Sequence, residues 1–209
     1  MATRDATEVR APQHGCLIYL VRHGRTLLNA QGRFRGRENP SLDAVGRAEA
    51  DRAADRLRNV GLREICSSPL ARARETAGAI ASPHALGVTV EPDLRDLDYG
   101  SWSGRTPDEV ARTDGDLYRR FLSDPVGVTP PGGERVGSAA DRVVRALHRI
   151  ALRNDRAEIA AVTHDVPIRL VLAHAAGLTA GAVWELDVPT GSIRRLQVTD
   201  ARVSVVGEL

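Results

Sequence analysis

The feature that most constrains the fold is an alternation of short apolar runs with longer segments of helical period. The short runs, which we expect to be buried strands, are 16–21, 64–67, 88–90 and 159–163. The longer segments carry apolar residues at helical spacing and are 43–59, 68–80, 106–122, 134–153 and 166–176. Strands that alternate with helices are typical of a mostly parallel sheet. We therefore predict an α/β fold, a three-layer sandwich with helices on both faces of the sheet.

The two ends of the chain differ from this pattern. Residues 183–206 alternate enough to supply two or three further strands, of which we expect the last to be antiparallel. Residues 1–15 are polar and mixed in charge, and they lack the apolar core of a signal peptide. We expect a flexible leader at 1–15 and a single domain at 16–209. No stretch approaches the length of a membrane span, so we expect a cytoplasmic protein without a membrane partner.

The composition narrows the class of partner. Apolar residues make up 42% of the chain, which excludes a disordered protein. The net charge is only +2, so charge alone does not favour a nucleic-acid partner. An RNA-binding or anion-binding protein would need aromatic stacking beside its arginines, and only Phe34 lies in the arginine cluster at 33–37. All 29 basic residues are arginine, so every cation that faces a phosphate is a guanidinium suited to bidentate contact.

Polar side chains follow three of the expected strands where each strand ends. Arg22 and His23 follow the first, Ser67-Ser68 leads from the second towards Arg72, and the third ends in Thr163-His164-Asp165. In open α/β sheets, ligands bind beyond the carboxyl ends of the strands. We therefore expect these three groups to converge on one site.

The first of these strand ends has the residues for covalent phosphoryl transfer. A neutral imidazole such as His23 can attack phosphorus and form a phosphoramidate, which divides one transfer into two steps. The adjacent Arg22 can bind the oxygens of the transferred group. Gly24 lets a ligand approach the backbone closely. An Arg-His pair alone is more often a solvated surface feature, so the rest of the chain has to decide its meaning.

The run Arg22-His-Gly-Arg-Thr-Leu-Leu-Asn29 resembles the signature of the histidine phosphatase superfamily, in its phosphoglycerate mutase-like branch. The resemblance extends through further motifs in the expected order, and these are 32–36, 40–46, 67–76, 94–104, 131–134 and 162–165. Because several separate motifs agree, a chance match is not a good explanation.

The resemblance implies a role for each matching residue. His23 would be the nucleophile, and Arg22, Arg72 and His164 would hold the phosphoryl oxygens. The proton donor would be Asp96, at a position where the family usually carries glutamate. Asp165 is a rival donor, because another branch of the superfamily uses a His-Asp pair, and Asp98 is a further alternative. The residues that would line the substrate site are Arg25, Thr26, Asn29, Arg35, Gly36 and Asp165.

Arg25 is a second departure from the family pattern, because glutamate or glutamine is usual there. It would make the pocket more cationic, or it would point to solvent, and the sequence leaves both readings open.

These features predict a phosphatase that hydrolyses a small phosphorylated metabolite through a phosphohistidine. No cofactor is expected, and no metal-ligand spacing is visible among the six histidines. A phosphoglycerate mutase-type phosphotransferase and a phosphate-binding module that has lost turnover are the alternatives. About thirty residues separate Gly104 from Glu134, which suggests a modest cap and favours hydrolysis over mutase activity. The sequence leaves open the substrate and whether the chain forms a homodimer.

Overall fold

The computed structural model describes residues 15–200 and 202–209. The strands are β1 (Gly15–Arg22), β2 (Leu62–Ser67), β3 (Val88–Val90), β4 (Glu158–Thr163), β5 (Ile193–Thr199) and β6 (Val203–Glu208). The α-helices are α1 (Leu27–Ala30), α2 (Ala44–Leu57), α3 (Ala71–Ala81), α4 (Pro107–Ser123), α5 (Val136–Arg153) and α6 (Asp165–Ala176). Short 3-10 helices cover Ser82–His84, Pro92–Leu94, Gly100–Trp102, Pro125–Gly127 and Ala180–Glu185.

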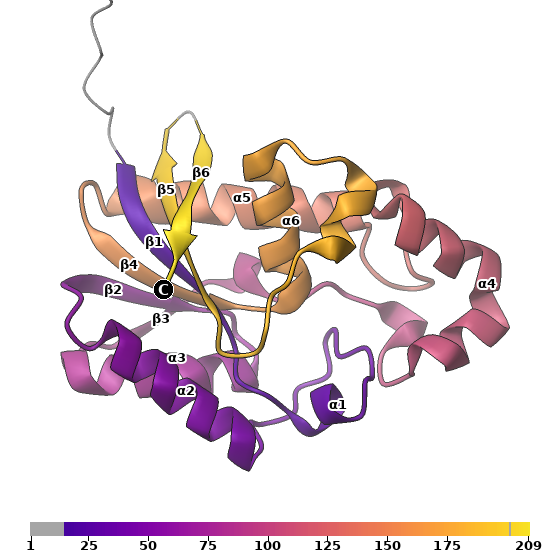
Figure 1. The fold of residues 1–209 in the computed structure, drawn as a ribbon, viewed down its shortest axis with the longest axis horizontal. Coiled ribbons are helices and arrows are strands. Elements are labelled where there is room, and N and C mark those ends of the chain that lie inside the picture. The colour runs from indigo at the N-terminus through magenta and orange to yellow at the C-terminus, as the bar shows by residue number, and fades with distance from the viewer. Residues whose placement is uncertain (1–14, 201) are drawn as a thin grey trace, which may run out of the picture.

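The six strands form one mixed sheet in the order β3-β2-β4-β1-β5-β6 (Figure 1). The first four in this order run parallel, whereas β5 lies antiparallel to β1 and to β6. Helices α2 and α3 cover one face of the sheet, and α5 and α6 cover the other (Figure 1). The predicted three-layer α/β sandwich is confirmed.

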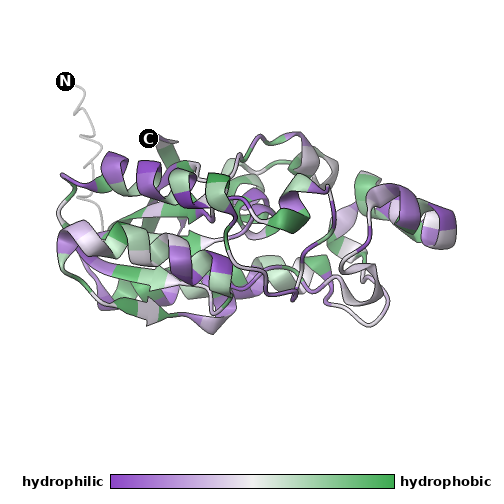
Figure 2. Ribbon diagram, turned by 90° about the horizontal axis from the view of Figure 1, so that it is seen from below, coloured by the Kyte–Doolittle hydropathy of each residue, from purple (hydrophilic) through white to green (hydrophobic). Residues whose placement is uncertain are grey.

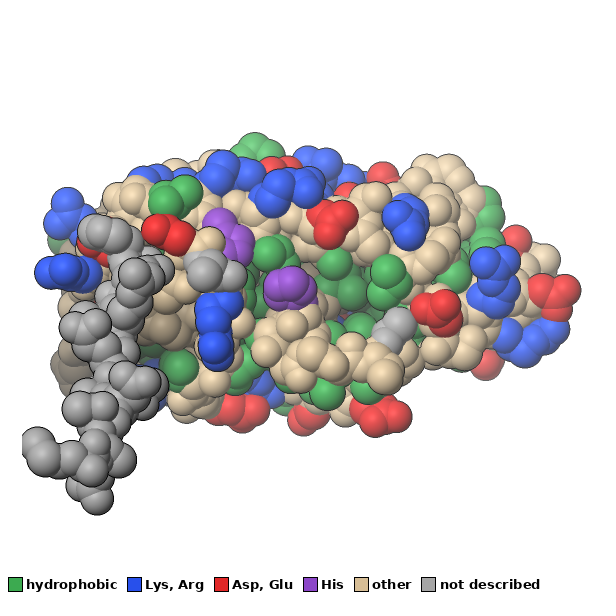
Figure 3. All heavy atoms as spheres, turned by 90° about the horizontal axis from the view of Figure 1, so that it is seen from above, with side chains coloured by type: hydrophobic (Ala, Val, Ile, Leu, Met, Phe, Trp, Pro, Cys, Tyr) green, Lys and Arg blue, Asp and Glu red, His purple; other side chains and the backbone are tan. Residues whose placement is uncertain are grey.

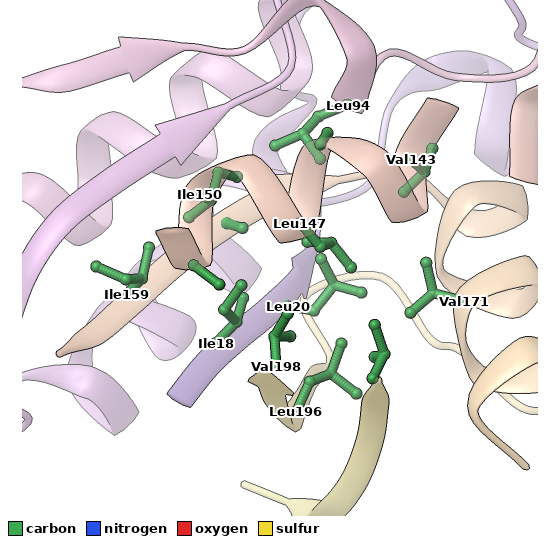
Figure 4. Packing of buried hydrophobic residues seen from close by; sticks show 14 of the residues in the cluster. Ile18, Leu20, Leu94, Val143, Leu147, Ile150, Ile159, Val171, Leu196 and Val198 are labelled. Atoms are coloured by element: carbon green, nitrogen blue, oxygen red, sulfur yellow. The ribbon is translucent and has the colours of Figure 1, made fainter. Parts of the chain in front are cut away.

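Residues of β1 contribute alternately to the two faces of the sheet, as the period of a strand requires. Ile18 and Leu20 pack against α5 and α6, in the cluster that Figure 4 shows. Tyr19 and Val21 belong to the cluster under α2 and α3. Figure 2 shows that the strands are largely hydrophobic while the helices mix hydrophilic and hydrophobic residues. The central strand is therefore buried on both sides, which explains its continuous apolar run.

A third apolar cluster lies beyond the sheet, around α4 and the 3-10 helix Gly100–Trp102. Helix α4 sits at the far end of the molecule from the β5–β6 hairpin (Figure 1). Its N-terminus is fixed by a capping box, in which Thr106 and Glu109 satisfy each other's backbone N–H groups. The cap that was expected between residues 104 and 134 therefore contains α4, which is kinked at Asp114, and its own apolar contacts.

The observed boundaries differ from the predicted ones by up to three residues at several elements. Gly15 belongs to β1, where its N–H donates to Asp155, so the strand begins one residue inside the predicted leader. The rest of that leader lies outside the described residues, and the single domain at 16–209 stays a prediction. Helix α3 begins at Ala71, because the extended Leu70 precedes it. The tail forms the two strands β5 and β6, and residues 180–185 form a 3-10 helix.

Among the described residues, no helix is long and apolar enough to cross a membrane. On the face that Figure 3 shows, arginine and acidic side chains are both present.

A close approach of two backbones should make one glycine irreplaceable. A Cβ on Gly46 in α2 would fall well inside contact distance of the Arg25 carbonyl oxygen, so α2 or the segment after β1 would have to move. We expect Gly46→Ala to lower the free energy of unfolding by about 1–3 kcal/mol, the usual cost of overpacking. The matched control is Gly78→Ala in α3, where a Cβ meets nothing within 4 Å.

Gly78→Ala should raise the free energy of unfolding by about 0.5–1 kcal/mol, since alanine favours an exposed helix. Urea denaturation of the two variants measures both effects. Equal changes in the two variants would contradict the close approach.

Candidate active site

Three strand ends meet at one edge of the sheet, because β4 lies between β1 and β2. In the register, Arg22 pairs with Thr163 and Ser67 pairs with Val162. The ladder continues one residue further, where the His23 N–H donates to the Thr163 carbonyl (3.0 Å). The expected convergence of these strand ends is confirmed, and the rings of His23 and His164 lie 5.0 Å apart between centroids.

Two hydrogen bonds determine which nitrogen of His23 carries the proton. Nδ1 lies 2.6 Å from the Gly24 carbonyl oxygen, which can only accept. Nε2 accepts from Nε of Arg72 (3.1 Å), which can only donate. Burial lowers the pKa of His23 well below its usual range, and the nearby Arg72 and Arg22 guanidinium groups lower it further. His23 is therefore neutral, with its lone pair on Nε2.

Arg72 connects the imidazole to a buried carboxylate. Its side chain, on the first turns of α3, is fully buried, and Nη2 donates to Oδ2 of Asp96 (3.1 Å). The remaining donors reach the carbonyl oxygens of Gly36 and Glu38. Asp96 is also buried, and its Oδ1 accepts the N–H of Leu97 (3.0 Å). Burial lowers the pKa of Arg72, while the Asp96 charge opposes that effect.

The imidazole of His164 has one nitrogen in a hydrogen bond and one nitrogen without a hydrogen-bond partner. Nε2 of His164 lies 2.7 Å from Oγ of Ser68, whereas the buried Nδ1 has no hydrogen-bond partner and lies 3.9 Å from Oδ2 of Asp96. Nε of Arg22 and Nε of Arg35 are likewise buried without a partner. Unpartnered buried donors are costly, so three of them at one place indicate a site built for an anion.

Asp165 balances the positive charge on the open side of this cluster. Its carboxylate lies 3.3 Å from Nη1 of Arg22, 3.9 Å from Nη2 of Arg35 and 2.8 Å from Nε of Arg169. Asp165 starts α6, where a carboxylate also favours the positive end of the helix dipole. Asp96 and Asp165 therefore have different surroundings. Asp96 is buried beside the imidazole of His164, whereas Asp165 forms ion pairs with three guanidinium groups.

Comparison with known proteins agrees with this arrangement. The model of the histidine phosphatase superfamily (branch 1) matches residues 18–207. The chain belongs to this superfamily. Phosphoserine phosphatase 1 of Hydrogenobacter thermophilus is 30% identical over 185 residues, which are 88% of each chain. A bifunctional protein of Mycobacterium tuberculosis is 39% identical over 177 residues, which are 84% of this chain, and the chain spans about half (48%) of that relative's length.

Solved structures of the family share the fold closely. YhfR of Bacillus stearothermophilus superposes with a TM-score of 0.86 at 27% identity, over 92% of this chain and 96% of that one. The alpha-ribazole phosphatase of Shigella flexneri gives a TM-score of 0.80 at 25% identity, over 92% and 95% of the two chains.

Three residues that the resemblance places at the substrate site, Arg25, Thr26 and Asn29, have hydrogen-bond partners other than His23 and the side chains that surround it. Nε of Arg25 donates to Asp43 (2.8 Å), the residue that caps α2. Thr26 is buried and forms a capping box with Asn29 around the single turn of α1. Gly36, by contrast, contacts the active-site residues directly, because its carbonyl oxygen accepts from Arg72. Its φ of 47° lies in the left-handed region that favours glycine. The substrate contacts of all four residues stay predictions.

Two supporting residues were missed from the sequence. Arg142 of α5 pairs with Glu134 at 2.7 and 2.8 Å and donates to the carbonyl oxygens of residues 93, 95 and 96, so it fixes the backbone that carries Asp96. Glu134 lies in a recognised motif, whereas nothing distinguishes Arg142 from the other arginines. Ser68, the partner of His164, lies in the 67–76 motif, but the resemblance did not imply a role for it. Among the described residues, no group of three His, Cys, Asp or Glu side chains could hold a metal ion.

The burial of His23 and His164 predicts how their protonation responds to pH. Burial and nearby arginines hold the pKa of His23 and that of His164 well below the usual value of about 6.5. We expect the ring signals of both residues to stay at their neutral positions as the pH falls from 8 to 6, in an NMR titration of histidine-labelled protein.

The lowered pKa values of His23 and His164 also predict how the free energy of unfolding depends on pH. Because the folded state binds these protons more weakly than the unfolded state, the free energy of unfolding should begin to fall as the pH drops below about 6.5. If both rings titrated near pH 6.5 and stability were flat there, the neutral tautomer derived for His23 would be wrong.

Proposed function

We propose that the chain is a phosphatase that hydrolyses a small phosphomonoester through a phosphohistidine on His23. The observation that carries the proposal is the neutral ring of His23, whose Nε2 accepts from Arg72 and whose centroid lies 5.0 Å from that of His164, in a site where Nε of Arg22 and Nδ1 of His164 are buried without a partner. A nucleophile beside unpaired donors is the arrangement that phosphoryl transfer needs. Membership of a family whose relatives include proteins named as phosphatases supports it.

The reaction has two steps. In the first, Nε2 of His23 attacks phosphorus, an N–P bond forms, and the P–O bond to the substrate alcohol breaks. Asp96 gives its proton to the departing oxygen. In the second step, water attacks the phosphohistidine, the N–P bond breaks, and the Asp96 carboxylate takes the proton from the water. Inorganic phosphate and the free alcohol are the products.

The phosphoryl oxygens bind to Arg22, Arg72 and His164. Arginine contacts phosphate oxygens in a bidentate manner, and Nδ1 of His164 supplies a further donor. In this buried site these donors stabilise the charge that develops on the transferred group. The proposal therefore needs no metal ion.

Asp96 suits the role of proton donor better than Asp165 does. It lies 3.9 Å from Nδ1 of His164 and shares Arg72 with His23, so it borders the reacting nitrogen. A bound phosphoryl group would compete with Asp96 for the Arg72 donors, which would leave the carboxyl group free to act on the leaving oxygen. Asp165 shares its carboxylate among three guanidinium groups instead.

Water is the acceptor in this proposal, rather than a second hydroxyl group of the substrate. A mutase must keep water away from its phosphoenzyme, which requires a well-closed site. Here the cap between Gly104 and Glu134 consists of α4 and one short 3-10 helix. Equilibration with monophosphoglycerates, with and without the bisphosphate, distinguishes the two activities, because a mutase would isomerise the substrate much faster than it releases phosphate.

Removal of the nucleophile is the direct test. We expect His23→Ala to lower kcat/KM for p-nitrophenyl phosphate by several orders of magnitude, because the covalent step is lost. Rapid acid-free quenching of the wild type should trap acid-labile phosphate on His23 and on no other residue. A variant that stays folded and turns over at a near-normal rate would exclude the mechanism.

The proton donor is tested by the dependence on the leaving group. Asp96→Asn should reduce hydrolysis of an alkyl phosphate far more than that of p-nitrophenyl phosphate, since a good leaving group needs no proton. Asp165→Asn is the matched control and should affect the two substrates to a similar extent. The assignment is wrong if Asp165→Asn shows this selectivity and Asp96→Asn does not.

A further inference from the structure

The few aromatic residues of this chain are gathered in one place. The sequence has two phenylalanines, two tryptophans and three tyrosines. Six of these seven rings form one connected cluster, whose members are Phe34, Tyr99, Trp102, Tyr118, Phe121 and Trp184. The seventh, Tyr19, lies on β1 in the cluster under α2 and α3. Aromatic side chains are therefore concentrated at the cap, on the side of the sheet edge where His23 lies.

Some rings of this aromatic cluster are buried, and others are partly exposed to solvent. Trp102 and Phe121 are buried, with ring centroids 5.5 Å apart. Phe34, Tyr118 and Trp184 are only partly buried. Phe34 lies 6.2 Å from Tyr118, and Phe121 lies 4.7 Å from Trp184, again between ring centroids. Three aromatic side chains thus remain partly accessible on a rigid support.

These rings line a cavity of about 280 Å³ that borders the proposed active site. Arg35, Tyr99 and Asp165 line the same cavity. Asp165 is paired with Arg22, and the Arg35 charge lowers the pKa of both His23 and His164. A phosphate ester with its phosphorus at His23 would therefore extend past Arg35 and Asp165 into the aromatic cavity.

The charges of the cavity limit what else the substrate can carry. Three arginines and one aspartate line it, so a cationic group is disfavoured. Arg33 is already bonded to Glu109 and the Gly104 carbonyl oxygen. Arg169 is bonded to Asp165 and to the backbone carbonyl oxygens of residues 183, 184 and 186. A carboxylate or second phosphate on the substrate would find only Arg35 with a free buried donor, and it would be repelled by Asp165.

From these contacts we propose that the substrate is a phosphomonoester whose alcohol carries an uncharged planar ring, held in the cavity formed by Phe34, Tyr118 and Trp184. Aromatic faces and guanidinium planes both stack on planar rings and do so without requiring a particular base. An engineered apolar cavity of about 150 Å³ accommodates one benzene ring, so this one is large enough for a bicyclic ring. The inference rests on the proposed phosphatase activity and names its substrate class.

A matched pair of substrates tests the ring alone. Adenosine 5′-monophosphate and ribose 5-phosphate release the same kind of primary alcohol, and only the first carries a planar aromatic base. We expect kcat/KM to be at least about tenfold higher for the nucleotide, the usual scale of base stacking on aromatic side chains. Phosphoserine, which carries a carboxylate and no ring, should be poorer than the nucleotide.

Variants of Tyr118 link this preference to the cavity. Tyr118→Ala should reduce the ratio of the two kcat/KM values towards one, whereas Tyr118→Phe keeps the ring and should keep the ratio. Leu152→Ala is the control for a surface substitution, because Leu152 lies on α5 and is 66% exposed. It should leave both kcat/KM values unchanged.

Binding provides a readout that needs no turnover. Both tryptophans of the chain belong to the cluster, so intrinsic fluorescence reports on the cavity. In His23→Ala, adenosine 5′-monophosphate should alter the fluorescence at a concentration at least about tenfold lower than ribose 5-phosphate does.

The outcomes separate the two proposals. Phosphate release from both substrates at equal efficiency, or best from phosphoserine, would overturn the ring preference and leave the phosphatase in place. No release from any substrate, p-nitrophenyl phosphate included, would overturn the phosphatase. In that case fluorescence still decides the ring preference: tighter binding of the nucleotide supports it, and equal binding refutes it.

Discussion

The burial of charge at one edge of the sheet is the constraint on which the rest of this structure depends. Arg72, Asp96 and His164 are each at most 1% exposed, and an uncompensated charge at that depth would be strongly destabilising. The ion pair between Arg72 and Asp96 offsets much of this cost, and the carbonyl oxygens of Gly36 and Glu38 accept the remaining donors of Arg72. The loop that carries Gly36 and Glu38 is therefore held in place by the guanidinium group of Arg72.

The same constraint explains the supporting residues. Asp96 can accept a hydrogen bond from Arg72 only if the loop that carries Asp96 is held in position. Arg142 holds this loop through Glu134 and three carbonyl oxygens. His164 is oriented by Ser68, from a different strand end. The reactive cluster is thus rigid, whereas the aromatic cavity beside it is built from the cap and the 33–35 loop. In the proposed function, the first part performs the chemistry and the second selects the substrate.

Much of this could be predicted from the sequence, for physical reasons. The buried strands were visible because a strand covered on both faces has to be continuously apolar. The meeting of the three polar groups followed from parallel strands, whose carboxyl ends lie at the same edge. Arg25 was ambiguous, because nothing local shows that its guanidinium reaches Asp43, which lies 18 residues further along the chain. Arg142 was invisible for the same reason, as its partners lie up to 49 residues away.

The sequence by itself determined the α/β class, the succession of strands and helices along the chain and the polar residues that follow three of the strands, because hydrophobic period and residue chemistry are local properties. Only the tertiary structure decided which nitrogen of His23 holds the lone pair, since this depends on Arg72 and Gly24 acting on opposite sides of the ring. It also decided that five aromatic residues, scattered from position 34 to position 184, line one cavity. Such properties arise from contacts between distant segments, and those contacts exist only once the chain has folded.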